Sequence, residues 1–189
     1  MASVNSWLNE WQEGWLNGVR PVPSPNYNSR PEASIVSLLV IHNISLPPGQ
    51  FGTPYIEQFF QNELPWDEHP YFTSIKGFEV SAHFLIKQDG EVVQFVSCHD
   101  RAWHAGASSF CGEDNCNDYS IGIELEGTDT APYTDAQYLA LVALTTQLQT
   151  AFPEITTSRI KGHSDIAPGR KTDPGESFDW VRYLNALGV

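Results

Sequence analysis

The chain has 189 residues, of which 41% are hydrophobic and 12% aromatic, and its formal net charge is −13. This length and composition are typical of one globular domain with a sizeable core, and they argue against a disordered chain. So negative a protein is poorly suited to gripping phosphate backbones or anionic lipid headgroups. We therefore expect neither nucleic acid nor a membrane as a partner.

The number of cysteines and the N-terminal sequence indicate the cellular compartment in which the protein is expected. Three cysteines, Cys98, Cys111 and Cys116, cannot all pair within one chain, which favours a reducing environment. The N-terminus reads MASVNSWLNEWQEGWL, without the basic start or the continuous apolar core of a secretion signal. No apolar run approaches the roughly 18 residues of a membrane span. We expect a soluble, cytoplasmic monomer.

The N-terminal segment predicts a short amphipathic helix within residues 1–18. Four apolar side chains recur there at helical spacing: Trp7, Leu8, Trp11 and Trp15. Gly18 and a series of prolines then end the pattern. We interpret residues 1–20 as an N-terminal extension of a single domain that spans residues 1–189.

Four segments have the composition of strands. They are residues 37–42, 84–86, 91–96 and 120–126. The first, SLLVIH, is a continuous apolar run typical of a central strand buried on both faces, and it ends at His42. The second and third flank Asp89-Gly90, a dipeptide that favours a hairpin turn. The fourth, SIGIELE, alternates in part between apolar and other residues.

Two helices are expected in the second half of the chain. Residues 134–152 carry an apolar stripe, with Thr134 and Gln137 placed for a capping box and Pro153 after the last turn. A second helix is expected from near Ser177 to Gly188.

A segment of forty residues lies between His42 and His83 and is rich in proline, glycine and aromatic residues. So long an irregular segment is often a functional cover, and we expect residues 44–82, which include His69, to form a mobile lid. An Ω-like surface excursion, or a short helix around Pro54–Phe60, is an equally good interpretation.

His42, His163 and Asp173 form a candidate metal site. Two imidazoles and a carboxylate can hold zinc and leave one position for water, which is the ligand pattern of catalytic sites. His42 ends a strand, and the other two lie in the Gly/Pro-rich stretch GHSDIAPGRKTDPG, where a rigid scaffold can present ligands. Spacing alone does not make this set specific, because most histidines do ordinary structural work.

A second group rich in thiols and imidazoles competes with this set. It comprises Cys98, His99, His104, Cys111 and Cys116. Thiolates and imidazoles are good zinc ligands, but the group lacks the short Cys-x-x-Cys spacing of zinc sites. Free thiols are the simpler interpretation.

Several charged residues could support chemistry beside a metal. Glu124 and Glu126 project from the same face of the expected strand, so pattern alone does not decide which could act as a base. Lys171 lies two residues before Asp173. Arg170 reads as a solvated surface charge, and Asp165 reads as an organiser of its own loop backbone.

Six motifs together resemble one enzyme family. They are VIHNISLPPGQFG, SAHFLI, RAWHAGAS, CNDYSIGIELEGTD, YTDAQY and GHSDIAPGRKTDPG. With the runs between them, from about Val22 to Trp180, they resemble the zinc-dependent N-acetylmuramoyl-L-alanine amidases, and within these the cytoplasmic AmpD-type anhydro-N-acetylmuramyl-L-alanine amidases of cell-wall recycling. The resemblance implies a mixed α/β fold with a central mixed β-sheet flanked by α-helices, shared with phage amidases and peptidoglycan recognition proteins.

The resemblance also implies roles for individual residues. The family's zinc ligands fall on His42, His163 and Asp173, so one zinc ion per chain is expected. The family's catalytic glutamate matches Glu124, which leaves Glu126 as a solvated strand-end acid. The family's functional lysine matches Lys171, whose charge would stabilise an oxyanion.

Further residues are implied at the substrate. Trp103 and His104 would form part of the cleft wall, although a core tryptophan and a satisfied loop histidine remain an alternative. Asn43 and Arg101 are expected near the substrate. His83 matches a family histidine that we interpret as structural. Two arginines that related enzymes place near substrate carboxylates are replaced here, by Glu79 and Asn115.

Three functions are consistent with these features. The first is hydrolysis of the amide between anhydro-N-acetylmuramic acid and L-alanine in recycled muropeptides. The second is a broader amidase acting on intact cell wall, which the missing export signal disfavours. The third is a non-catalytic muropeptide-binding or regulatory module on the same fold. A lost ligand or base would mark this last function, and the sequence retains the three ligands, Glu124 and Lys171.

Overall fold

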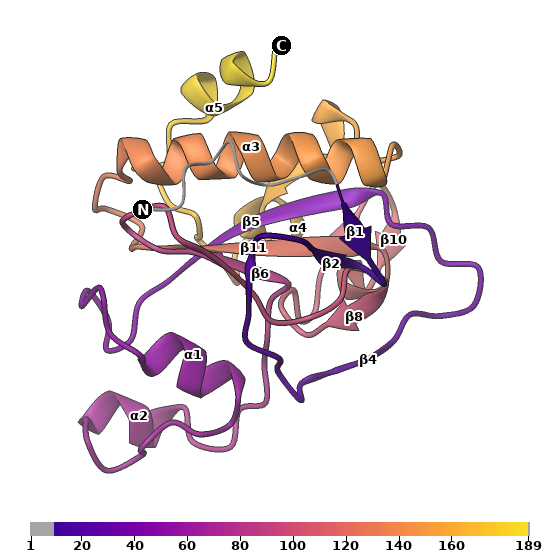
Figure 1. Cartoon of the computed structure of the whole chain (residues 1–189). Helices are drawn as coiled ribbons and strands as arrows, with labels where there is room; N and C mark the ends of the chain where they lie inside the picture. Colours follow the sequence, from indigo (N-terminus) through magenta and orange to yellow (C-terminus); the bar gives the residue numbers. More distant parts are fainter. Residues whose placement is uncertain (1–9, 189) are drawn as a thin grey trace.

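A computed structural model describes residues 10–188. A mixed sheet that includes β5, β11 and β6 lies at the centre (Figure 1). It has six strands, in the order β12-β5-β11-β6-β7-β3. Its strands are β3 (Arg20–Pro21), β5 (Leu38–Ile44), β6 (Phe84–Ile86), β7 (Val92–Gln94), β11 (Ser120–Glu126) and β12 (Ile160–Gly162). Strands β12, β5, β11 and β6 run parallel, whereas β6 and β7 form the expected antiparallel hairpin.

Shorter elements surround the sheet. Three antiparallel pairs are β1 (Trp11–Gln12) with β2 (Trp15–Leu16), β4 (Tyr27–Ser29) with β8 (Asp100–Ala102), and β9 (Ser109–Phe110) with β10 (Glu113–Asp114). The helices are α1 (Tyr55–Phe60), α2 (Pro70–Ser74), α3 (Asp135–Ala151), α4 (His163–Ile166) and α5 (Trp180–Ala186). The expected mixed sheet flanked by helices is therefore confirmed. Among residues 10–188, no helix combines the length and the hydrophobicity needed to cross a bilayer.

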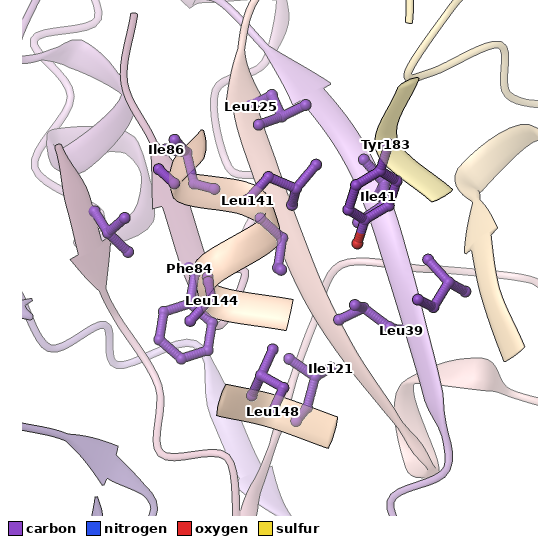
Figure 2. Packing of buried hydrophobic residues seen from close by; sticks show 14 of the residues in the cluster. Leu39, Ile41, Phe84, Ile86, Ile121, Leu125, Leu141, Leu144, Leu148 and Tyr183 are labelled. Carbon is purple, nitrogen blue, oxygen red and sulfur yellow. The ribbon is translucent and has the colours of Figure 1, made fainter. Parts of the chain in front are cut away.

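Helix α3 covers one face of the sheet, and α5 packs outside it (Figure 1). Thr134 and Gln137 form the expected capping box at the start of α3. Leucines of α3 meet alternate residues of the central strands, so that Leu39 and Ile41 of β5 point towards this core (Figure 2). Because side chains alternate along a strand, His42 points to the opposite face of the sheet.

Strand β11 has two unlike faces. Ile121, Ile123 and Leu125 belong to the core under α3. The alternate residues on the other face are small or polar, namely Ser120, Gly122, Glu124 and Glu126. Parallel pairing places Glu124 directly beside His42 of β5. One face of the sheet therefore supplies stability, and the other presents side chains suited to chemistry.

The segment from residue 45 to residue 82 crosses this second face and is more ordered than an irregular loop. It contains α1, which confirms the interpretation of a short helix around Pro54–Phe60, and it also contains α2. Ile56, Phe60 and Phe72 are buried in a second core that includes Leu85 and Val93 of the sheet. The lid expected over residues 44–82 thus carries its own packed helices, and its mobility stays a prediction.

The prediction of a helix within residues 1–18 is wrong for residues 10–18, the part of this segment that the structure describes. Trp7 and Leu8 lie outside the described residues. Residues 11–16 form a hairpin, with Glu13 and Gly14 at positive φ in the two-residue turn. A Cβ on Gly14 would lie 2.3 Å from the Ser97 hydroxyl oxygen, so the turn packs tightly on the domain. Trp11, one of the two described members of the pattern, meets Phe152 at the end of α3 edge to face.

Candidate metal centre and active site

Three side chains from distant parts of the chain converge near the C-terminal end of β5, which continues two residues past His42 to Ile44. His42 Nδ1, His163 Nδ1 and Asp173 Oδ2 lie 3.0 Å from one another in every pairing. His163 begins α4, directly after β12, and the Ser164 N–H donates to the Asp173 backbone carbonyl at 3.0 Å. This contact folds the loop after α4 back so that Asp173 faces both histidines. Both imidazoles are almost completely buried.

The protonation pattern of this triangle favours a cation. His163 Nε2 lies 3.0 Å from the Ala105 carbonyl, which can only accept, so the neutral ring carries its proton there. His163 Nδ1 then offers a lone pair towards the Asp173 carboxylate. Burial lowers the pKa of His42 to about 4, which keeps this imidazole neutral at pH 7. Burial alone would raise the pKa of Asp173, but its close contacts with the His163 and His42 imidazoles outweigh burial and hold this pKa below the ordinary value.

The spacing of the three donor atoms fits a zinc-sized ion. Tetrahedral nitrogen and oxygen ligands about 2.0–2.1 Å from zinc lie roughly 3.3 Å apart, slightly more than the 3.0 Å found here. Among residues 10–188 this is the one group of side chains placed to hold a metal ion. The competing cysteine and histidine group does not assemble. Cys98 and Cys116 are buried, Cys111 is exposed, and all three are free thiols.

Glu124 lines the cleft beside the metal centre. It is 8% exposed, and its Oε2 atom has no hydrogen-bond partner in the described chain. Burial, reinforced by the charge of Asp173, raises its pKa well above the ordinary value, whereas Lys171 opposes that rise. A buried carboxylate with a free oxygen and a raised pKa is suited to exchanging protons.

The cleft itself has a volume of about 390 Å³. One wall is polar and holds the three candidate ligands with Glu124, Lys171 and Asn43. A second part of the lining, the apolar wall, comes from the segment after β5 and comprises mainly apolar residues: Leu46, Pro48, Phe59, Phe60, Ile75, Phe78 and Val80. Trp103 and His104 also line the cleft. The site can therefore hold a substrate with a polar reacting group and an apolar or ring-shaped flank.

Arg101 is the expected substrate contact that is not found at the cleft wall of the described chain. Its guanidinium pairs with Asp118 and donates to Asn28 Oδ1 at 3.3 Å. The Trp103 indole N–H donates to the same Asn28 oxygen at 2.7 Å. These contacts place Arg101 behind Trp103, where it supports the cleft wall. Asn43 does line the cleft, and its amide donates to Asp129 at 2.8 Å.

Comparison with known proteins identifies the family. Residues 31–176 match the family described as N-acetylmuramoyl-L-alanine amidase. The chain belongs to this family. It is 57% identical over 171 residues to the 1,6-anhydro-N-acetylmuramyl-L-alanine amidase AmpD of Citrobacter freundii, which covers 90% of this chain and 91% of the relative.

Solved structures agree with the sequence match. A crystal structure of a selenomethionine derivative of AmpD superposes with a TM-score of 0.91 at 55% identity, covering 94% of this chain and 99% of the other. A complex of the Escherichia coli amidase AmiD with anhydro-N-acetylmuramic acid-L-Ala-D-γ-Glu-L-Lys superposes with a TM-score of 0.60 at 26% identity. That match covers 93% of this chain and 64% of the other.

In this amidase, Glu126 is not the solvated acid that the sequence suggested. It is 1% exposed, and its two carboxylate oxygens accept the Gly52 N–H at 2.6 Å and the Gln88 N–H at 3.1 Å. It therefore ties the start of the cleft's apolar wall to the β6–β7 hairpin. Nothing in the local pattern of β11 indicates this role, because both partners are backbone groups from distant loops.

Glu126→Gln should destabilise the amidase more than it slows it. The amide keeps one acceptor but turns an N–H donor towards one of the two backbone N–H groups, which costs about 1–3 kcal/mol. Denaturant unfolding should show this loss, while turnover per folded molecule stays close to wild type. A variant as stable as wild type but catalytically dead would contradict the anchoring role.

Arg170 also differs from its expected role as a solvated charge. Its guanidinium donates to the carbonyls of Ala105 and Ala107, each at 2.6 Å, and so holds the loop after Trp103 against the loop after α4. Asp165 behaves as expected, because its carboxylate accepts the Gly162 N–H at 2.8 Å. His83 is fully buried and accepts the Gly122 N–H, which places it in the scaffold behind the site.

Proposed function

We propose that this amidase uses one zinc ion to hydrolyse the amide between anhydro-N-acetylmuramic acid and L-alanine in muropeptides. The observation that supports this proposal most directly is the convergence of His42, His163 and Asp173 in a cleft that also holds Glu124. The choice of substrate rests on the AmpD relatives, which match this chain over nearly its whole length. The setting is peptidoglycan recycling in the cytoplasm, by a monomer that folds as a single domain over residues 1–189.

Different residues of the cleft have different roles in the proposed reaction. A zinc ion bound by His42, His163 and Asp173 would supply Lewis acidity towards the amide carbonyl and the attacking water. Glu124 takes a proton from that water and later delivers it to the leaving amine of L-alanine. Lys171, exposed at the cleft rim, brings a positive charge to the oxyanion that forms on the carbonyl oxygen when water adds to the carbonyl carbon.

The shape of the cleft suits a compact sugar derivative. Trp103, in the lining of the same cleft as the apolar wall, offers an aromatic face against which a sugar ring can lie. An anhydro sugar has no free reducing end, so a closed cleft accepts it and rejects a continuing glycan. The chain's charge of −13 gives little long-range attraction to an anionic substrate, so local contacts supply recognition.

The test compares matched substrates that differ only in the anhydro bond. We expect at least about a hundredfold higher kcat/KM for anhydromuramyl peptides than for ordinary muramyl peptides, equivalent to roughly 3 kcal/mol. Digestion of intact sacculi with and without a chelator is the parallel arm. Similar efficiencies on both peptides, or ready solubilisation of sacculi, would assign the protein to a broader amidase class. Binding of the peptides without any turnover would favour the non-catalytic module.

A further inference from the structure

The two histidine ligands are oriented by two consecutive residues of one loop. His42 Nε2 lies 2.9 Å from His104 Nδ1, and His163 Nε2 lies 3.0 Å from the Ala105 carbonyl oxygen. The Ala105 carbonyl can only accept, and His104 Nδ1 accepts from His42 when His104 carries its own proton on Nε2, towards the Ser120 hydroxyl. Such partners fix the tautomer and the orientation of a ligating imidazole.

The loop between β8 and β9 is not paired in a sheet, so no strand ladder satisfies its backbone hydrogen-bonding groups. Strand β8 ends at Ala102 and β9 begins at Ser109, so the backbone between them must find other partners. The side chain of Asn117 provides two of them, because its Oδ1 atom accepts the His104 N–H at 3.1 Å and the Ala105 N–H at 2.8 Å. A single amide oxygen therefore sets the position of both orienting groups.

Asn117 is itself rigidly placed. It is 6% exposed and lies in the 3₁₀ turn Cys116–Asp118, directly before β11. The guanidinium of the partly buried Arg30 donates to the backbone carbonyls of Asn117 and Asp118 at 3.1 and 3.0 Å. Arg30 thus holds the backbone of the turn, while the side chain of Asn117 reaches the loop between β8 and β9.

The His104 ring has no freedom to compensate for a displaced loop. It packs directly on Gly122 of β11, where a Cβ would lie 2.6 Å from the ring. Its second nitrogen, Nε2, lies 3.1 Å from the Ser120 hydroxyl. The ring is therefore held between β11 and His42, while Asn117 holds the backbone N–H of the same residue.

We propose that Asn117 is a positioning residue of the metal centre, acting through His104 on His42 and through Ala105 on His163. This inference rests on the proposed metal site and extends it to a residue that touches neither metal nor substrate. Loss of an outer partner of a ligating histidine typically weakens metal binding by roughly 10- to 100-fold. Asn117 controls two such partners at once, so we expect the upper part of this range.

The test measures zinc affinity by competition with a chromophoric chelator, using full-length protein. Asn117→Ala should bind zinc roughly 100-fold more weakly than wild type. Asn117→Asp retains the acceptor oxygen and should restore most of the affinity. The cobalt-substituted protein provides a second reading, because its visible absorption reports coordination geometry and should change in Asn117→Ala but not in Asn117→Asp.

A matched control separates positioning from general destabilisation. Thr145→Val removes a buried 2.6 Å hydrogen bond to Tyr183 on the α3 side of the sheet. It should lower the unfolding temperature of the metal-free protein without changing zinc affinity. If Asn117→Ala does not fold, His104→Phe carries the same test, because it removes the acceptor for His42 while filling the space of the ring.

The outcomes distinguish this inference from the proposed function. Wild-type protein that binds no zinc would overturn the metal site itself. Tight, stoichiometric zinc in wild type with unchanged affinity in Asn117→Ala or in His104→Phe would overturn only the role of Asn117. Equal losses of affinity in Asn117→Ala and Asn117→Asp would also overturn it, because the acceptor oxygen would then not be what matters.

Discussion

Glu124→Gln is expected to lower turnover by roughly two to four orders of magnitude while zinc stays bound. The substitution keeps the shape of the side chain but removes its ability to accept a proton from the attacking water. Because Glu124 contributes no ligand atom to the triangle of His42, His163 and Asp173, the metal content should remain that of wild type. Metal analysis and steady-state kinetics on the same preparation check both halves of the prediction.

The two glutamates of β11 provide matched controls for each other. Glu124 has an unpartnered buried oxygen and a pKa raised by burial, so replacing it by a neutral amide should leave stability intact or increase it. Glu126 has both oxygens satisfied by backbone N–H groups, so the same replacement should cost stability and spare turnover. If the two variants exchanged these effects, the assignment of the base to Glu124 would be wrong.

The central elements could be predicted from the sequence because local and global signals agree in them. The apolar run ending at His42, the hairpin around Asp89-Gly90 and the capping box at Thr134 each correspond to an element of the structure. The N-terminal hairpin could not, because tryptophans four residues apart suit a helix as well as the two sides of a tight turn. In the structure, Glu13 and Gly14 both adopt positive φ and form the turn, which places Trp11 and Trp15 on the two paired strands.

In the candidate site, too, some residues could be predicted from the sequence and others could not. His42 and His163 are 121 positions apart, and spacing over such a distance carries no geometric information, so the ligand set depended on the family resemblance. Among the supporting residues, Asp165 and His83 could be predicted as structural, whereas Arg170 and Asn117 could not. Arg170 and Asn117 act on the loop around Ala105 through backbone groups, which any sequence supplies, so no residue pattern marks these contacts.

Removal of Asp173 is expected to abolish metal binding and activity together. Asp173→Ala leaves two imidazoles facing each other without the carboxylate that bridges them at 3.0 Å from each. Two neutral nitrogen ligands cannot replace a set that includes a negative charge. A catalytic metal contributes several kcal/mol of transition-state stabilisation, so its loss should lower turnover by roughly a thousandfold or more.

Asp165→Ala is the matched control for this change, since it removes another aspartate from the same stretch of chain, in α4 rather than in the loop that follows it. Its carboxylate accepts a backbone N–H and contributes no atom to the ligand triangle, so its loss should reduce stability while zinc stays at one ion per chain. Chelation followed by added zinc should restore activity in wild type and in Asp165→Ala, but not in Asp173→Ala. Wild-type protein that is fully active after gentle purification without metal would refute the metal centre, because Glu124 and Lys171 would then have to perform the hydrolysis without Lewis acidity.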